Sequence, residues 1–531
     1  MKLTALLKPL RDAVVVNSAD RSIRGLTLDS RRVRPGDLFA VVPGPHCDGT
    51  AYVRDAIARG AVAILASTKA QVPPDVTLVL VPEVRLALAD LACRFYGSPA
   101  DLVRIVGVTG TNGKTTTATL VRWLLAHAGK QAALLSTVVH QIGTRRIPAS
   151  NTTPESPELQ SYLAEMVERH IGYAVMEVSS HSLDQERVRG IRFTVAALTN
   201  VTPHEHLDYH RSFDAYKAAK AKLFESLAPE ATAVLNADDA HFAYYAERRG
   251  PGKRMSYGIA SIADCRLPIA DCPFEEAIGN RKSEIGNRKC DVTGVIEAAD
   301  LLGMTLRIST PVGHERVRSP LIGAYNAQNL LAGVCCALAL GLDLPAIAAG
   351  IERFTGAPGR LERVDEGQPF TVLIDYAHNN DGLRSVLSTL RPLVTGRLIV
   401  VFGAGGDRDP SKRPLMGGTA ARYADLTVLT ADNSRSEKTE DIVAAIRAGM
   451  PSDAPCLIEP GRREAIRRAI AAAEPGDLVL LAGKGHETYQ EIGGVRYPFD
   501  DREEAEQALR SLSLRRAKVA GRAALGIGVS P

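Results

Sequence analysis

The sequence lacks the features that mark membrane and exported proteins. No apolar run approaches the roughly 18 residues that a membrane-spanning helix needs. The N-terminus, Met1–Thr4, carries one basic residue and only a short apolar patch, so a signal peptide is not expected. These absences predict a cytoplasmic protein that has no membrane partner.

Cysteine spacing and charge exclude two further classes. None of the eight cysteines forms a C-x-x-C pair, so the spacing of a structural zinc site is missing. The 64 basic and 60 acidic residues give a formal net charge of only +4, which does not favour a nucleic-acid partner. We expect reduced cysteines in the interior or in loops, at Cys47, Cys93, Cys265, Cys272, Cys290, Cys335, Cys336 and Cys456.

Strand and helix patterns alternate along the chain, which predicts an α/β protein of several domains. At roughly 150 residues per domain, a chain of 531 residues suggests three or four domains. We expect a small N-terminal α/β domain (1–99), a central domain with a mostly parallel sheet (100–340) and a C-terminal Rossmann-like domain (341–510). The last stretch (511–531) is rich in Ala, Gly and Arg and is expected to be a flexible tail.

Short apolar runs locate the strands of these domains. An imperfect repeat within 277–290, I-G-N-R-K twice, suggests a local duplication in a surface loop. Helices are expected at 52–59, 114–128 and 213–227. Strands are expected at 38–42, 61–65, 103–108, 173–176, 195–198, 233–235, 370–374, 397–402, 426–429 and 478–481.

A Gly-rich turn joins the predicted strand 103–108 to the helix that starts at Lys114. Its glycines let backbone amides converge on phosphate oxygens, and the helix N-terminus adds partial positive charge. Lys114 is placed to pair with the β- and γ-phosphates of ATP, and the Thr115 hydroxyl to coordinate Mg²⁺. Val108 stands where the strict P-loop pattern has glycine, so a chance Gly-rich turn is the alternative. The predicted ATP contacts are Gly110, Thr111, Asn112, Gly113, Lys114, Thr115 and Thr116.

This turn, G-T-N-G-K-T-T, resembles that of the Mur ligase and folylpolyglutamate synthetase superfamily, and matching motifs extend over residues 22–505. The resemblance implies an ATP-dependent ligase that forms an amide bond. Its three domains are expected to bind a UDP-linked substrate, ATP and an amino acid, in that order. Folylpolyglutamate synthetase is the nearest rival. A P-loop GTPase-like switch is a rival of another class, although no N-K-x-D guanine motif is visible near the loop.

Glu177 directly follows the predicted strand 173–176. The carboxyl ends of strands are where α/β sheets bind ligands, and Mg²⁺ prefers oxygen ligands, so Glu177 is a candidate for binding Mg²⁺. A surface glutamate without a ligand is the alternative.

The run 200–210 is dense in histidine and acidic residues, and read alone it is compatible with a zinc site. It resembles the family motif N-x-x-x-x-D-H-L-D-Y-H, with Glu205 where Asp is usual. The resemblance assigns His206 to a second Mg²⁺. His204 and His210 are expected to be structural or close to the substrate.

Lys220 projects from a mainly apolar face of the predicted helix 213–227. Burial disfavours the ammonium form, and a neutral amine can capture CO₂ to become a carbamate. A lysine whose ammonium reaches solvent is the alternative. The resemblance implies that Lys220 is N6-carboxylysine and helps to hold Mg²⁺. The implied ligands of two Mg²⁺ ions are Thr115, Glu177, His206 and Lys220, and the implied catalytic residues are Lys114, Lys220, Glu177 and His206.

Contacts to the UDP-muramoyl-peptide substrate are implied by three further segments. The run 29–39, D-S-R-R-V-R-P-G-D-L-F, resembles a uridine-binding start, although Pro-Gly-Asp also simply makes a turn. Hydroxyl, amide and guanidinium groups in 151–154 and 179–187 suit a polyanionic substrate, and loop capping is the alternative. The implied contacts are Ser30, Thr152, Thr153, Ser179, Gln185 and Arg187.

The C-terminal third carries the remaining ATP contacts and those for the amino acid. Asn326, Arg360, Asp375 and His378 are implied to contact the nucleotide, although Asn379-Asn380-Asp381 replaces the usual Thr-Pro-Asp. D-N-S-R at 432–435 resembles the diaminopimelate signature D-N-P-R, with Ser434 in place of Pro. Arg435 is expected to grip the distal carboxylate, a group that lysine lacks. The implied contacts to the amino acid are Arg408, Asp432, Asn433, Arg435, Gly483 and Glu487.

The resemblance therefore implies that meso-2,6-diaminopimelate is added to the D-glutamate of UDP-N-acetylmuramoyl-L-alanyl-D-glutamate through an acyl phosphate, in the synthesis of peptidoglycan precursors. An L-lysine-adding homologue is the alternative. The expected partners are these small molecules and ATP, and the protein is expected to be a monomer.

Overall fold

A computed structural model of the chain describes residues 1–17, 21–44, 49–203, 206–260 and 290–524, and the side chains of all of these except 208 and 515–524. The chain forms two compact units. One comprises Met1–Gly258, Cys290–Val292 and Leu331–Ile347, and the other Ile259–Lys289, Thr293–Leu330 and Ala348–Pro531.

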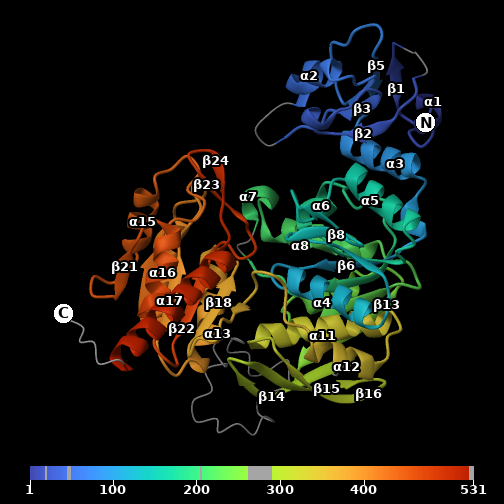
Figure 1. The fold of residues 1–531 in the computed structure, drawn as a ribbon. Coiled ribbons are helices and arrows are strands. Elements are labelled where there is room, and N and C mark those ends of the chain that lie inside the picture. Colours follow the sequence, from blue (N-terminus) through green and yellow to red (C-terminus); the bar gives the residue numbers. More distant parts are fainter. Residues whose placement is uncertain (18–20, 45–48, 204–205, 261–289, 525–531) are drawn as a thin grey trace. The chain divides into compact units, whose positions relative to one another are not determined.

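The first unit begins with a five-stranded sheet (Figure 1, blue). Its strand order is β1-β5-β4-β3-β2, with β1 antiparallel to β5 and the other pairs parallel. The strands are β1 (Val14–Val16), β2 (Gly25–Thr27), β3 (Asp37–Ala40), β4 (Ala63–Ala66) and β5 (Thr77–Leu80). The helices are α1 (Leu3–Leu6), α2 (Val53–Ala58), α3 (Val84–Tyr96) and the 3-10 turns η1 (Ser30–Arg32), η2 (Gly49–Tyr52) and η3 (Pro99–Asp101).

A larger sheet follows in the same unit, and its strands run in the order β13-β12-β11-β6-β10-β7-β8-β9. Among these eight strands, all pairs from β13 to β7 are parallel, and β8 and β9 run antiparallel to their neighbours. The strands are β6 (Arg104–Thr109), β7 (Ala132–Leu135), β8 (Val139–Ile142), β9 (Arg145–Pro148), β10 (Tyr173–Glu177), β11 (Phe193–Leu198), β12 (Thr232–Asn236) and β13 (Lys253–Ile259).

Helices cover both faces of this sheet. Successive residues of a strand point to opposite faces, so an apolar strand presents apolar side chains on both. On one face α5 (Ser156–Glu168) and α8 (Phe213–Glu225) pack through apolar side chains against strand residues that include Ile105 and Met176. On the other face α4 (Lys114–His127) lies against β6, β7 and β10. The remaining helices of this region are α6 (Ser180–Asp184), α7 (Leu207–His210) and α9 (Phe242–Glu247).

The second unit contains a six-stranded sheet in the order β17-β18-β22-β19-β20-β21, parallel except for β17. Its apolar residues alternate between two cores, one beneath α13, α14 and α15 and the other beneath α16 and α17, which lie side by side (Figure 1). The strands are β17 (Glu362–Val364), β18 (Thr371–Asp375), β19 (Leu398–Phe402), β20 (Leu426–Leu429), β21 (Cys456–Ile458) and β22 (Leu478–Ala482). The helices are α13 (Asn380–Leu390), α14 (Lys412–Tyr423), α15 (Thr439–Arg447), α16 (Arg462–Ala472) and α17 (Asp501–Ala524).

The antiparallel strands β14 (Val292–Asp300), β15 (Gly303–Thr310) and β16 (Gly313–Ser319) pair in that order, and β23 (Tyr489–Ile492) and β24 (Val495–Pro498) form a hairpin. The helices α11 (Ala324–Ala339) and α12 (Leu344–Glu352) and the 3-10 turn η6 (Arg391–Leu393) lie between the main strands in sequence.

The α/β class and the mostly parallel central and C-terminal sheets are confirmed, and each predicted strand coincides with an observed one to within two residues at either end. Helix α17 extends to Ala524, into the stretch 511–531 that is predicted to be a flexible tail, and that prediction stays a prediction. The Ala, Leu and Arg residues of this helix are strong helix formers, which outweighs the occasional glycine. The predicted domain borders remain predictions. The duplication at 277–290 lies outside the described residues except for Cys290. The five described cysteines, Cys93, Cys290, Cys335, Cys336 and Cys456, are free thiols, as expected.

Candidate active site

Four neighbouring parallel strands end at one edge of the central sheet and define the candidate site. Their order is β11-β6-β10-β7, so the residues that follow them meet at this edge. The phosphate loop follows β6, Glu177 ends β10, Thr199 follows β11, and Thr137 lies two residues after β7. The sequence prediction that Glu177 lies at the carboxyl end of a strand is thus confirmed.

The phosphate loop is held from the side by the residues that follow β11. The Thr111 amide donates to the Asn200 carbonyl (2.7 Å), and the Asn112 amide donates to the Asn200 side-chain oxygen (2.9 Å). The Thr199 hydroxyl donates to the Asn112 carbonyl (2.6 Å). Gly110 has φ +149°, and a Cβ there would lie 1.9 Å from the Thr199 hydroxyl oxygen, so only glycine fits this close approach.

Two lysines share a backbone oxygen of this loop. Lys114 donates to the carbonyls of Gly110 and Thr111, both at 2.9 Å. Lys220 reaches the Gly110 carbonyl from α8, also at 2.9 Å, and is only 1% exposed. Burial, with a smaller contribution from the Lys114 ammonium, lowers the pKa of Lys220 well below its usual value. The predicted orientation is confirmed, because Lys222 on the same helix is instead exposed and pairs with Asp184.

Glu177 is 1% exposed and is held in one orientation. Its Oε1 accepts a hydrogen bond from the Thr137 amide (2.9 Å) and its Oε2 one from the Thr137 hydroxyl (3.3 Å). That hydroxyl also contacts the Thr152 hydroxyl (3.1 Å). The carboxylate of Glu177 and the hydroxyl of Thr115, a buried residue that is 4% exposed, provide oxygen ligands of the kind that Mg²⁺ prefers.

An aromatic cluster lies beside α8. The His206 ring lies 4.9 Å from that of His181 and 5.8 Å from that of Tyr216, measured between centroids. His210, which is expected to be structural or close to the substrate, is buried, and its Nε2 lies 2.9 Å from the Ser180 hydroxyl. His204 and Glu205 lie outside the described residues. The described residues contain no group of three His, Cys, Asp or Glu side chains with metal-site geometry.

The predicted contacts to the muramoyl peptide also connect to Glu177. The Thr153 hydroxyl donates to the Glu177 carbonyl (2.8 Å) and accepts from the Ser179 amide (3.1 Å). Arg187 donates to the Thr153 carbonyl (3.0 Å) and to the Gln185 side-chain oxygen. Thr152, Thr153, Ser179, Gln185 and Arg187 therefore form one connected group with Glu177. Ser30 is 7% exposed in η1, where the Asp29 side chain caps the turn by accepting from the Arg31 amide.

In the second unit, Asp375 ends β18 and organises the loop before β17. Its carboxylate accepts from the amides of Leu361 (2.8 Å) and Ala377 (2.9 Å), and burial raises its pKa. The Arg360 guanidinium lies over the Tyr376 ring at 4.8 Å, and the ring of His378 lies 4.6 Å from that of Tyr376. Asn326 is 4% exposed and donates to the Ile322 carbonyl (2.8 Å).

The D-N-S-R loop is fixed by β23. The Arg435 amide donates to the Glu491 carbonyl (3.0 Å), and the Glu491 amide donates to the Asn433 side-chain oxygen (2.9 Å). Arg435 has φ +51° and its guanidinium donates to the Gly406 carbonyl. Asn433 donates to Glu487 (2.8 Å), so two of the predicted amino-acid contacts touch each other. Arg408 is exposed.

The sequence interpretation missed several residues of the site. Thr137 holds Glu177 but belongs to no motif. Tyr216 donates to, or accepts from, the Thr111 hydroxyl (3.0 Å) and lies beneath Lys220 with its ring 4.6 Å from Nζ. Its position four residues before Lys220 on the same helix face is a signal that could have identified it. Lys484 lies between Gly483 and Glu487, which are both implied contacts to the amino acid.

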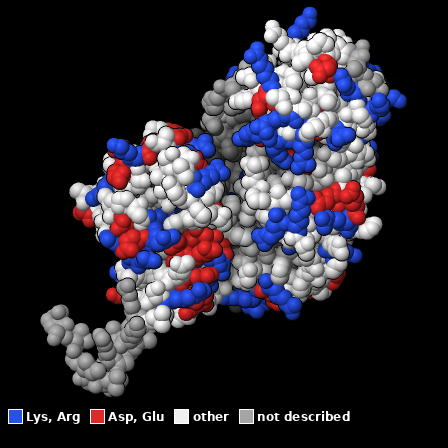
Figure 2. Space-filling view, turned by 45° about the horizontal axis from the view of Figure 1, so that its top comes forward, with Lys and Arg blue, Asp and Glu red and all other residues white. Residues whose placement is uncertain are grey.

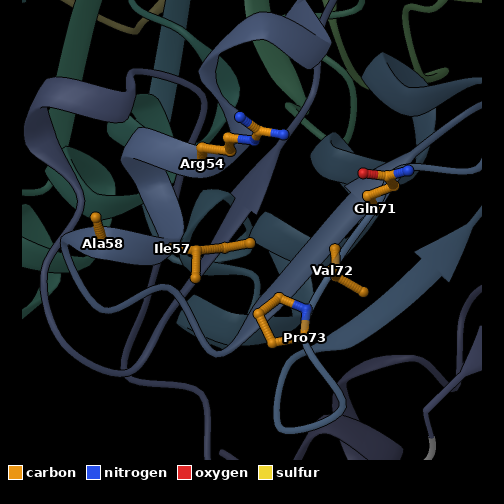
Figure 3. Close-up of a pocket in the computed structure, with 6 residues that line it drawn as sticks. All are labelled: Arg54, Ile57, Ala58, Gln71, Val72 and Pro73. Atoms are coloured by element: carbon orange, nitrogen blue, oxygen red, sulfur yellow. The ribbon is translucent and has the colours of Figure 1, made fainter.

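A surface pocket of about 360 Å³ lies elsewhere in the first unit (Figure 3). Helix α2 contributes Arg54, Ile57 and Ala58, and the segment before β5 contributes Gln71, Val72 and Pro73. None of these six is a predicted contact. The face of the molecule in Figure 2 carries acidic and basic side chains among uncharged ones, consistent with the near balance of charge in the sequence. Across the described residues no helix is long and apolar enough to cross a bilayer.

Known proteins resemble this chain in sequence and in fold. Family models match for the "Mur ligase family, catalytic domain" (residues 22–96), the "Mur ligase middle domain" (108–337) and the "Mur ligase, glutamate ligase domain" (359–485). The chain therefore belongs to the Mur ligase family, whose enzymes are ATP-dependent ligases that join an acid to an amino acid.

Individual relatives cover nearly the whole chain. A protein of Geobacter metallireducens is 41% identical over 97% of this chain and 99% of its own length. One of Synechococcus elongatus is 42% identical over 95% of this chain and 97% of its own length. Both are named UDP-N-acetylmuramoyl-L-alanyl-D-glutamate--2,6-diaminopimelate ligase. A solved structure with the same name is 31% identical, has a TM-score of 0.66 and covers 97% of this chain and 100% of its own.

Proposed function

We propose that this chain adds meso-2,6-diaminopimelate to the D-glutamate of UDP-N-acetylmuramoyl-L-alanyl-D-glutamate, using ATP. The observation that carries the proposal is the group of residues at one sheet edge, where the phosphate loop, Glu177 and the buried Lys220 meet. The relatives of nearly equal length, which carry the name of this activity, support it. In this role the protein works in the cytoplasm as a monomer on a peptidoglycan precursor, and so contributes to cell-wall biogenesis, cell shape and cell division.

The reaction proceeds in two steps. The side-chain carboxylate of D-glutamate attacks the γ-phosphorus of ATP, which gives an acyl phosphate and ADP. The amine of diaminopimelate then attacks the acyl carbon, phosphate leaves, and the nitrogen loses a proton. Lys114 and amides of the phosphate loop are the proposed groups that stabilise the negative charge on the transferred phosphoryl group. Thr152, Thr153, Ser179, Gln185 and Arg187 orient the peptide, and Ser30 contacts the UDP part.

Two Mg²⁺ ions fit the chemistry of the donors at this edge. Thr115, Glu177, His206 and Lys220 are the proposed ligands, and bound Mg²⁺ offsets the charge of the phosphates. Lys220 becomes a ligand once its neutral amine attacks CO₂, which forms an N–C bond and releases one proton to leave N6-carboxylysine. The lowered pKa of Lys220 supports this step because the neutral amine is the nucleophile.

The second unit supplies the groups for the nucleotide and the amino acid. Asn326, Arg360, Asp375 and His378 are the proposed contacts to the nucleotide. Arg408, Asp432, Asn433, Arg435, Gly483 and Glu487 are the proposed contacts to diaminopimelate. Arg435 is suited to the distal carboxylate, and the carbonyl of Gly483 and the carboxylate of Glu487 are suited to the distal ammonium.

Phosphate release and product mass test the proposal directly. Purified protein is given ATP, Mg²⁺ and the UDP-muramoyl dipeptide with either meso-diaminopimelate or L-lysine, and a folate with L-glutamate serves as a third arm. We expect turnover with diaminopimelate, and loss of most of it in Arg435→Ala. Preference for L-lysine would overturn the choice of amino acid but keep the ligase. ATP left intact in all three arms would overturn the whole proposal.

A further inference from the structure

Lys484 is fully buried, with 0% of its side chain exposed, directly after β22 and Gly483. A buried ammonium is costly unless it is paired and hydrogen-bonded. Because it has no access to solvent, Lys484 does not itself touch a bound amino acid. Any effect of Lys484 on binding must therefore act through the side chains that surround it.

Those groups are three of the proposed contacts to diaminopimelate. The Lys484 Nζ donates to the Asn433 Oδ1 (3.2 Å) and to the Glu487 Oε2 (3.2 Å), and lies 4.0 Å from an oxygen of Asp432. The Asn433 Nδ2 donates to the same Oε2 of Glu487 (2.8 Å). Both donors therefore use one oxygen of Glu487, whose side chain remains 19% exposed, and the other oxygen is not engaged by either.

The ammonium also sets the orientation of the Asn433 amide. The Asn433 Oδ1 accepts from Lys484 and from the Glu491 amide (2.9 Å), which are both donors. The oxygen of the amide must therefore face Lys484, and its NH₂ group must face Glu487. Removing the ammonium takes away one of the two donors that select this orientation.

The charges of these side chains also suit a cationic group of the substrate. Of the three side chains in this cluster, Asp432 and Glu487 are acidic and only Lys484 is basic. The buried Arg462 also interacts electrostatically with both carboxylates, but it is already paired with Asp501. One further cation would balance the three side chains. The distal ammonium of diaminopimelate supplies it. Without Lys484 the two carboxylates would repel each other with no cation between them.

We infer that Lys484 is a positioning residue for amino-acid recognition: through Asn433 and Glu487 it holds a carboxylate oxygen ready for the distal ammonium of the incoming amino acid. The inference rests on the proposed function. It predicts a loss that is specific to the distal amine rather than a general loss of activity.

Steady-state kinetics on the full-length protein test it, with Lys484→Met as the main variant. We expect KM for diaminopimelate to rise about 10- to 100-fold, as for loss of hydrogen bonds to charged groups, while KM for ATP changes less than twofold. Lys438→Met, an exposed lysine that precedes α15, is the matched control and should leave both values unchanged. Lys484→Gln keeps a hydrogen-bond donor on a side chain that is one bond shorter, and it should show a smaller rise in KM for diaminopimelate. If Lys484→Met does not fold, the KM of Lys484→Gln alone tests the inference.

A substrate analogue and a double variant separate positioning from a merely structural role. With 2-aminopimelate, which lacks the distal amine, the ratio of variant to wild-type KM should fall close to one. In Lys484→Gln/Glu487→Gln, the change at 484 should add no further rise to that of Glu487→Gln alone.

Equal KM values for wild type and Lys484→Gln, or an equal rise for both amino acids, would overturn the role of Lys484. Absence of any diaminopimelate turnover by the wild type would instead overturn the proposed function, so the two failures are distinguishable.

Discussion

The Nζ of Lys220 lies 2.9 Å from the carbonyl oxygen of Gly110, so a helix from one part of the central fold reaches directly into the phosphate loop. The same oxygen accepts a hydrogen bond from Lys114. Two amines that share one acceptor repel each other when both are charged, which adds to the effect of burial on Lys220. The contact joins the proposed carbamate site to the proposed phosphate site at a single backbone atom.

Lys220→Ala is expected to abolish ligase activity, and a short carboxylic acid such as acetate should partly restore it. The added carboxylate replaces the oxygen ligand that the carbamate is proposed to provide. Phosphate release with and without acetate measures the effect. Lys222→Ala, on the exposed side of the same helix, is the control and should retain activity. Turnover like that of the wild type by Lys220→Ala would refute the role of the carbamate.

Stability should depend on pH through Lys220 when bicarbonate and Mg²⁺ are absent. The pKa of Lys220 is lowered on folding from an ordinary value of 10.5, so the unfolded chain binds more protons between the two values. The stability contributed by the neutral Lys220 amine is fully present above pH 10.5. As the pH falls toward the lowered pKa, the free energy of unfolding decreases by up to about 1.4 kcal/mol per pH unit. The difference in melting temperature between Lys220→Met and the wild type should therefore shift in favour of the variant as the pH falls from 10 to 7. A constant difference over that range would contradict the buried, neutral amine.

Gly110→Ala should destabilise the protein more than Gly129→Ala. Both glycines have positive φ, +149° at Gly110 and +71° at Gly129, so alanine is strained at each position. The left-handed conformation costs a residue with a Cβ about 1–2 kcal/mol. Only at Gly110 would the added Cβ meet another atom, 1.9 Å away, whereas nothing lies within 4 Å at Gly129. Melting temperatures and ATP affinity measure the difference. Similar losses for the two variants would show that the phosphate loop adapts to the methyl group.

Ser434→Ala is expected to raise the melting temperature. The Ser434 hydroxyl is buried, at 1% exposure, and has no hydrogen-bond partner, so its removal relieves an unsatisfied polar group that costs about 1–3 kcal/mol. Ser436→Ala is the control, because the Ser436 hydroxyl donates to Asp407 and its loss should lower stability. A lower melting temperature for Ser434→Ala would mean that the hydroxyl is satisfied in solution.

Much of the fold could be predicted because the information is local. Apolar runs such as 426–429 and 478–481 have the length of strands and are too short for most helices, which indicates buried strands. The Gly-rich turn before Lys114 lies between a run with a strand pattern and a run with a helix pattern. The helical spacing of 213–227 placed Lys220 on the apolar face without knowledge of what covers it. The D-N-S-R run could likewise be recognised as a motif.

Only the tertiary structure decided which residues touch. Thr137 holds Glu177 from 40 positions away, and Lys484 reaches Asn433 across 51, because parallel strands bring distant segments to one edge of a sheet. The sequence by itself determined the ten predicted strands, the three predicted helices and the motifs, since these follow from local periodicity and backbone sterics. The order of the strands and the burial of Lys220 and Lys484 were settled by packing, since the desolvation and pairing of a charge depend on every neighbour that surrounds it.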